Sequence, residues 1–134
     1  NDSRMVIADD VNLDGKLDLI IDSNPPNWNP QTQGNTLEVY LNQMPSTGNF
    51  IGVRLQDKAG APSSTAAKIV ISTGGRIQAA ANVNGDSYES QHAATKHFGI
   101  GENDKVDYIE VTWMNGSKRR IENPTVNQYH LIEF

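Results

Sequence analysis

The sequence has 134 residues, no cysteine and a formal net charge of −5 at pH 7. This length is enough for a domain with a core of its own, and the missing cysteines exclude disulfides, thiolate metal sites and cysteine nucleophiles. The acidic balance disfavours nucleic acid and anionic membranes as partners, and no apolar stretch approaches the roughly 18 residues of a membrane span.

The first distinctive segment is a loop at residues 10–18 whose side-chain oxygens alternate along the chain. Oxygen ligands stand at loop positions 1, 3, 5 and 9, which are Asp10, Asn12, Asp14 and Asp18. Gly15 takes the sharp turn at position 6, and the Lys16 carbonyl would supply position 7. A hard cation such as Ca²⁺ takes roughly six to eight oxygens, which a tight loop can gather at one point. The spacing therefore predicts a Ca²⁺ site on Asp10, Asn12, Asp14, Lys16 and Asp18.

The flanks of this loop distinguish it from an EF-hand. An EF-hand needs a bidentate Glu at position 12, where this chain has Ile21. Residues 5–8 and 17–22 are rich in aliphatic side chains, which predicts a strand on each side of the loop. The alternative is an Asp/Asn/Gly turn that binds nothing. Because three carboxylates in nine residues would repel one another without a cation, we favour the metal site.

Turn residues divide the whole chain into short β-rich segments with almost no helical periodicity, which predicts an all-β fold. The predicted strands are residues 4–8, 17–22, 37–42, 50–56, 66–72, 76–83, 95–98, 107–113, 117–122 and 128–133. Gly74-Gly75 and Asn115-Gly116 predict hairpin turns. Side chains that alternate along 107–113 should share one face of a sheet, and these are Ile109, Val111 and Trp113.

A linker-like run at residues 42–49 predicts two parts, 1–42 and 43–134. The larger part should be an antiparallel β-sandwich or barrel-like domain. The smaller part has three strands and one metal loop, too little for a core of its own. We expect it to present one apolar face, built from Val6, Leu19, Ile21, Val39 and Leu41. That face should pack on the larger part, so that the two unfold together and deletion of 1–42 leaves an unstable remainder.

These segments carry a resemblance to known families. Residues 8–22, followed by 37–42, resemble an FG-GAP or VCBS repeat, the calcium-bearing blade unit of integrin-type β-propellers. The remainder is similar to the ASPIC/UnbV domain that follows such repeats in secreted bacterial proteins and in cartilage acidic protein. The matching pieces are residues 52–55, 74–78, 85–91, 97–101, 106–113 and 115–116. The resemblance implies a partial propeller-blade β-meander with a calcium loop, then a β domain, in a fragment of a longer propeller protein.

The sequence departs from the ASPIC/UnbV pattern at two places. The Trp-Pro-Ser-Gly turn of the family is Trp113-Met114-Asn115-Gly116 in this chain, and the expected Ile-Gly-Ala run is Thr65-Ala66-Ala67. Neither departure touches the calcium loop.

Two histidines, His92 and His97, invite comparison with a zinc site or a catalytic triad. Zinc needs closely spaced His or Cys pairs and further ligands, and no Gly-x-Ser-x-Gly elbow for a triad is present. We expect His97 instead to hold the turn at residues 98–101 by a hydrogen bond. The acidic cluster at 102–107 and the basic run at 118–120 are expected to be solvated.

Trp28 is the remaining candidate, because it stands in a loop rich in Pro and Asn, residues 25–30, with no strand face of its own to pack on. It is either an exposed ligand-binding aromatic or local core, and the sequence leaves both open.

These observations predict a calcium-stabilised extracellular binding or adhesion-type module without catalytic activity. The alternative is an accessory or substrate-binding part of an extracellular polymer-acting hydrolase, with Trp28 as the platform. The expected cofactor is Ca²⁺, and the expected partner is an extracellular protein or a carbohydrate ligand. The expected location is extracellular, periplasmic or at the cell surface.

Overall fold

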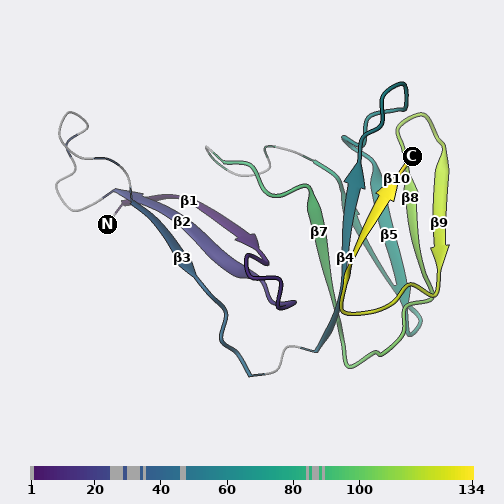
Figure 1. Ribbon diagram of the computed structural model, residues 1–134, viewed down its shortest axis with the longest axis horizontal. Coiled ribbons are helices and arrows are strands. Elements are labelled where there is room, and N and C mark those ends of the chain that lie inside the picture. Colours follow the sequence, from purple (N-terminus) through teal and green to yellow (C-terminus); the bar gives the residue numbers. More distant parts are fainter. Residues whose placement is uncertain are drawn as a thin grey trace. The chain divides into compact units, whose positions relative to one another are not determined.

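The computed structural model describes residues 2–24, 29, 34, 36–45, 48–83, 85, 88 and 90–134. The strands among them are β1 (Asp2–Asp9), β2 (Asp18–Asn24), β3 (Thr36–Tyr40), β4 (Asn49–Gln56), β5 (Lys68–Thr73), β6 (Arg76–Ala81), β7 (Thr95–Gly101), β8 (Tyr108–Thr112), β9 (Lys118–Glu122) and β10 (Tyr129–Glu133) (Figure 1). Each one overlaps a predicted strand, so the all-β prediction is confirmed. Within the described ranges there is no helix that could cross a membrane.

The chain divides into two compact units. The first comprises Asn1–Pro45 together with Gly85–Ala93, and the second comprises Ser46–Asn84 and Ala94–Phe134. The connection between β6 and β7 therefore contributes to the first unit, although it is far from that unit in the sequence. The predicted domain limits, 1–42 and 43–134, did not include this return of the chain.

The first unit is built on an antiparallel sheet with the strand order β1-β2-β3. The register places Val6 opposite Ile21 and Ile7 opposite Ile20, and Ile20 in turn lies opposite Val39. Val39 is therefore on the opposite face from Val6 and Ile21. The predicted single apolar face was wrong in this respect, because the long connection between β2 and β3 leaves their register unspecified by the sequence.

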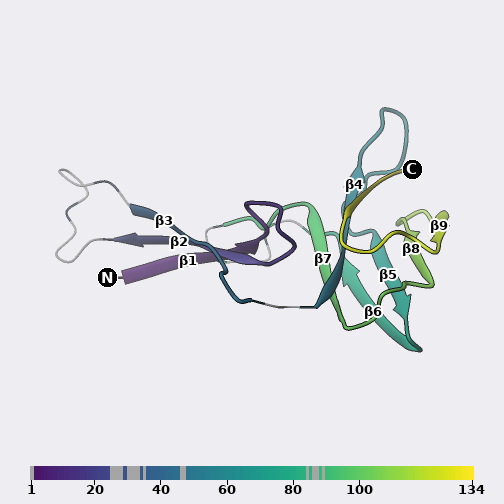
Figure 2. The same ribbon diagram turned by 60° about the horizontal axis from the view of Figure 1, so that its bottom comes forward.

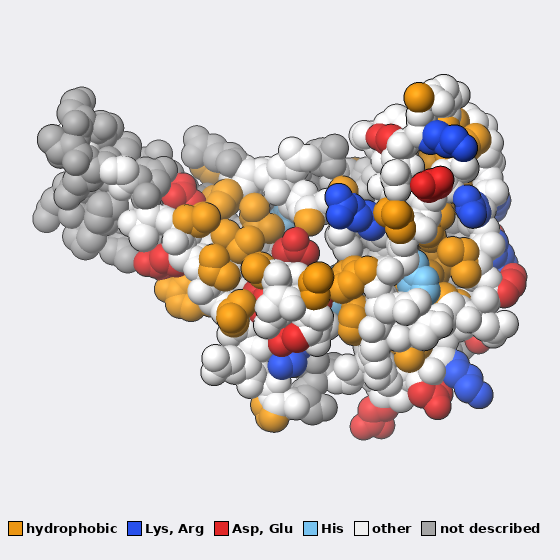
Figure 3. Space-filling model, viewed as in Figure 1, with side chains coloured by type: hydrophobic (Ala, Val, Ile, Leu, Met, Phe, Trp, Pro, Cys, Tyr) orange, Lys and Arg blue, Asp and Glu red, His pale blue; other side chains and the backbone are white. Residues whose placement is uncertain are grey.

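Both faces of this sheet are in fact apolar. Paired residues of a sheet share a face, which groups Val6, Ala8, Leu19, Ile21 and Tyr40 on one side and Met5, Ile7, Ile20, Leu37 and Val39 on the other. Several of these side chains remain exposed, and Figure 3 shows hydrophobic side chains gathered over β1–β3. A sheet with two apolar faces is typical of one that is covered on both sides.

The second unit is a sandwich of two open sheets, with strand orders β10-β4-β7 and β6-β5-β8-β9 (Figures 1 and 2). The sandwich prediction is confirmed, and the barrel-like alternative is wrong because the described strands do not close into a barrel. Pairing is antiparallel except between β10 and β4, which run parallel. The sequence predicted a purely antiparallel domain. A parallel pair between strands this far apart leaves no local signal in the sequence, so it could not be predicted.

The core of the second unit lies between its two sheets. Its buried side chains are Ile51, Val53, Leu55, Ala67, Ile69, Ile71, Phe98, Ile100, Val106, Ile109, Val111, Trp113 and Ile132. The predicted alternation along β8 is confirmed, because Ile109, Val111 and Trp113 are all in this cluster. The Trp113 ring also meets the Phe134 ring edge to face, with 5.2 Å between centroids.

Both predicted hairpin turns are present. Gly74 and Gly75 have φ values of 54° and 77°, which two-residue turns between β-strands require and glycine adopts at no steric cost. In the other hairpin Gly116 has φ of 85°, and the Trp113 N–H donates to the Ser117 carbonyl at 2.9 Å.

Ala66 is the residue at which the family pattern has glycine, and its backbone explains that preference. Its φ is 63°, in the left-handed region that costs an L-residue roughly 1–2 kcal/mol. Two hydrogen bonds hold the backbone of Ala66 in this conformation. The Ala66 N–H donates to the Asn82 carbonyl, and the Asn82 N–H donates to the Ala67 carbonyl. The segment before β5 is therefore a fixed turn instead of the start of a strand at residue 66.

The two charged runs are exposed, as expected. The basic run is on β9, the edge strand of its sheet, where charge opposes edge-to-edge association. Lys118 and Arg120 pair with Glu110 on the neighbouring strand, and Arg120 also covers the Tyr108 ring at 3.5 Å from its centroid.

Candidate functional site

The predicted calcium loop connects β1 to β2 in the first unit. The two strands end their pairing at Asp9 and Asp18, and the chain reverses between them. Two residues of the reversal, Leu13 and Gly15, have left-handed φ values of 60° and 86°. Gly15 adopts this conformation at no cost, so its place at the turn position agrees with the sequence argument.

Asp10 anchors the front of the loop. Its side chain is only 5% exposed, its Oδ1 accepts the Asp14 N–H at 3.0 Å, and its Oδ2 accepts the Gly15 N–H at 2.8 Å. Both oxygens of this carboxylate therefore face the interior of the loop. The Asp14 and Gly15 N–H groups thus hold this carboxylate in a fixed orientation.

Asp18 anchors the back of the loop and is fully buried. Its Oδ2 accepts the Val11 N–H at 3.0 Å, and its Oδ1 accepts the Asn42 N–H at 2.7 Å. These two hydrogen bonds offset part of the cost of removing the carboxylate from water. No Lys, Arg or His in the described ranges forms an ion pair with Asp18.

Asn42 is a residue of this site that the sequence argument missed. Besides the N–H donated to Asp18, its Nδ2 donates to the Leu17 carbonyl at 3.3 Å, and its carbonyl lies 3.5 Å from the Lys16 Nζ. Asn42 is 24 residues from Asp18 in the sequence, so no local pattern connects the two residues. The loop is therefore tied to the chain directly after β3, where the predicted linker begins.

Asn12, Asp14 and Lys16 form the outer side of the loop. The Asn12 Oδ1 accepts the Asp14 N–H at 3.2 Å, and the Lys16 N–H donates to the Asp14 Oδ1 at 3.0 Å. The Lys16 ammonium lies 3.3 Å from the Asp14 Oδ2. Desolvation raises the pKa of Asp14, but the hydrogen bonds from Lys16 and Asn12 and the Lys16 charge outweigh it and hold the pKa below its ordinary value.

All five predicted ligand residues belong to one hydrogen-bonded loop, but their side chains do not form a closed carboxylate cluster. Within the part of the chain that the structure describes, no three His, Cys, Asp or Glu side chains are grouped closely enough to hold a metal ion. The donors are all oxygens, which suits Ca²⁺ better than a softer metal. Chemically the donor set fits a calcium ion, provided that Asp14 turns from Lys16 toward it.

The other predicted site residues are less informative. Trp28 lies outside the described residues. His97 belongs to β7, which continues to Gly101, so residues 98–101 are strand and not the turn we expected. The His97 ring stacks on Phe50 at 4.8 Å, and its Nδ1 lies 3.3 Å from the Tyr129 hydroxyl. His92 falls in the segment that joins the first unit, and is half-buried.

Comparison with known proteins gives one result. A family model described as ASPIC and UnbV matches residues 58–134. No curated protein sequence matches the chain. The match covers most of the sandwich, and it leaves the predicted calcium loop outside.

Proposed function

Because this chain belongs to the ASPIC and UnbV family, an extracellular-type β domain, we propose that it is a calcium-stabilised extracellular binding or adhesion-type module without catalytic activity. Its ligand would be an extracellular protein or a carbohydrate. Its place would be outside the cytoplasm, secreted, periplasmic or on the cell surface.

The burial of two carboxylates in one short loop is the observation that carries this proposal. Asp10 and Asp18 are both almost completely removed from solvent, and their oxygens accept four backbone N–H groups between them. A turn that bound nothing would be stable with exposed polar residues. Two buried negative charges in one short loop are stabilised by a cation, and calcium is the cation whose ligand preferences these residues meet.

The sheet that carries the loop supports the second element of the proposal, a propeller-type blade of the FG-GAP or VCBS kind. Its two apolar faces need cover on both sides, as the sheets of a propeller receive from their neighbours. In such an assembly the calcium loop would fix the β1–β2 connection and, through Asn42, the start of the linker to the sandwich.

Lys16 competes with calcium for the Asp14 carboxylate. Its ammonium lies 3.3 Å from the Asp14 Oδ2, so calcium would displace this ion pair when Asp14 acts as a ligand. Exposed ion pairs of this kind are weak because water screens them, so displacement lowers the affinity only modestly. The expected dissociation constant is therefore that of extracellular calcium modules, on the order of 10⁻⁴ to 10⁻³ M.

Thermal unfolding with and without calcium tests the proposal. At the tight end of this affinity range, 1 mM free Ca²⁺ would stabilise the native state by about 1.4 kcal/mol, because the ion binds the folded chain alone. A domain of this size should then melt several degrees higher in calcium than in chelator. Differential scanning calorimetry at low protein concentration measures the shift.

Two variants make the test specific. Asp14→Asn keeps the shape of the side chain but removes a ligand charge, and should abolish most of the shift. Asp104→Asn removes an exposed carboxylate outside the loop, and should leave the shift intact. Equal melting temperatures of the unmodified protein in calcium and in chelator would refute the proposal.

A further inference from the structure

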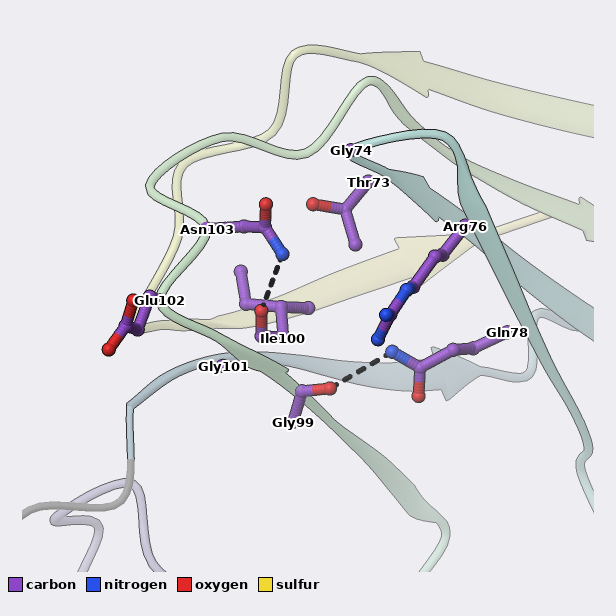
Figure 4. A pocket seen from close by; sticks show the side chains of 9 residues that line it. All are labelled: Thr73, Gly74, Arg76, Gln78, Gly99, Ile100, Gly101, Glu102 and Asn103. Carbon is purple, nitrogen blue, oxygen red and sulfur yellow. Dashed lines mark hydrogen bonds between the residues drawn. The ribbon is translucent and has the colours of Figure 1, made fainter.

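The second unit contains a cavity of about 470 Å³ at one open side of the sandwich (Figure 4). It is lined by Thr73, Gly74, Arg76 and Gln78 of the β5–β6 hairpin and by residues 99–103 at the end of β7. Strands β6 and β7 are edge strands of their respective sheets. The cavity therefore lies where the two sheets separate, and it is distinct from the calcium loop of the first unit.

The β7 side of the cavity is held by two side-chain amides. The Gln78 Nε2 donates to the Gly99 carbonyl at 2.9 Å, which also fixes the orientation of that amide. The Asn103 Nδ2 donates to the Ile100 carbonyl at 2.8 Å. The Gly99 carbonyl lies on the free edge of β7, and the Gln78 side chain that already binds it competes with pairing of a peptide strand there. A compact polar ligand suits this cavity better than a peptide strand.

The hairpin side of the cavity packs closely against the Asn103 amide. A Cβ at Gly74 would lie 2.8 Å from the Asn103 Oδ1, so a larger residue would displace this side chain. The Asn103 Nδ2 is directed to the Ile100 carbonyl, which leaves its Oδ1 at the cavity wall as an acceptor for hydroxyl groups. The β5–β6 turn therefore holds the Asn103 side chain in place at the cavity.

Arg76 is the cation among the residues that line the cavity. Among the described residues its guanidinium has no hydrogen-bond or ion-pair partner. Arg76 and Gln78 are two residues apart on β6 and so share a face, and Figure 4 shows their nitrogen ends pointing toward one another in the cavity. Glu102 points away from Arg76 in the same view. The Gln78 Nε2 keeps its second hydrogen after donating to the Gly99 carbonyl, and together with the Arg76 guanidinium it forms a pair of donors that is complementary to an oxyanion.

We propose that this cavity binds a carboxylate flanked by hydroxyl groups, with Arg76 and Gln78 on the carboxylate and the Asn103 Oδ1 on a hydroxyl. A planar guanidinium is well matched to a carboxylate, which it can bind through two parallel hydrogen bonds. The same chemistry occurs in the uronic acid units of acidic polysaccharides and in free hydroxy acids. This inference rests on the proposed binding function and names the class of ligand.

Amide chemical shifts of the ¹⁵N-labelled chain test the inference with galacturonate, galactose and lactate as probes. Galacturonate should shift the amides of residues 74–78 and 99–103, with a dissociation constant on the order of 1 mM for a ligand of this size. Galactose, which lacks the carboxylate, should not shift them. Binding of lactate as tight as that of galacturonate would assign the site to free hydroxy acids, and tighter binding of trigalacturonate would assign it to the polymer.

Two arginine variants control for charge. Arg76→Gln should weaken galacturonate binding at least tenfold, whereas Arg54→Gln removes an exposed charge from β4 outside the cavity and should leave binding unchanged. The spectra themselves report whether each variant is folded. The inference would be overturned if galacturonate at ten times the expected dissociation constant caused no shifts. Equal galacturonate binding by the two variants would overturn it as well. A normal calcium-dependent rise in melting temperature beside either result would leave the calcium proposal standing.

Discussion

Replacement of Asp18 with alanine is expected to destabilise the first unit by about 2–4 kcal/mol, because two hydrogen bonds to a charged acceptor are lost at once. The Val11 and Asn42 N–H groups both donate to this buried carboxylate. Asp18→Asn keeps one acceptor oxygen in the same shape, and should therefore cost about half as much. The loss should appear first in the strands that flank the loop.

Hydrogen exchange of the β1 and β2 amides measures this effect in the first unit alone. Asp104→Ala is the matched control, since it removes an exposed aspartate from the other unit, and it should leave the exchange of these amides unchanged within about 0.5 kcal/mol. If Asp18→Ala leaves their protection unchanged, the Asp18 hydrogen bonds do not hold the loop closed.

Ile109→Ala should destabilise the second unit by about 2–5 kcal/mol. Ile109 is fully buried in the middle of β8, opposite Ile71 on one side and Ile121 on the other. Truncation leaves a cavity between the two sheets that neighbouring strands cannot fill without breaking their pairing. Urea titration followed by Trp113 fluorescence and by amide signals of β5 and β8 measures the change.

Ile77→Ala provides the comparison for this experiment. Ile77 is on β6 of the same sheet but is 69% exposed, so truncation there removes the same atoms with little burial to lose. We expect a cost below about 1 kcal/mol for this variant. Similar costs for Ile77→Ala and Ile109→Ala would mean that the two sheets do not pack as the described core requires.

Local sequence signals were sufficient to predict the strands but not all of their partners. Gly74-Gly75 and Asn115-Gly116 specify hairpins through backbone conformation, so the β5–β6 and β8–β9 pairs followed directly. The β2–β3 register had no such signal, and a shift of one residue moves every side chain to the other face. This is why Val39 was assigned to the same face as Ile21, although it lies opposite Ile20.

The candidate sites show the same limit. The candidate calcium loop could be proposed from the sequence because its side-chain oxygens stand at positions 1, 3, 5 and 9 of one short segment. Asn42 could not, since only the fold brings it to Asp18. The carboxylate cavity was missed for a similar reason, because Arg76 and Asn103 come from elements that are separated in the sequence, and residues 102–107 alone were typical of a solvated turn.

A calcium titration followed by ¹⁵N amide shifts tests the central claim most directly. A saturable shift confined to residues 10–18 and Asn42, fitted by one ion per chain with a dissociation constant on the order of 10⁻⁴ to 10⁻³ M, is the predicted result. Asp14→Asn should raise the dissociation constant for Ca²⁺ at least tenfold, whereas Asp104→Asn should leave it unchanged. A linear, non-saturating response, or shifts outside this loop that Asp14→Asn leaves unchanged, would contradict calcium binding at this site.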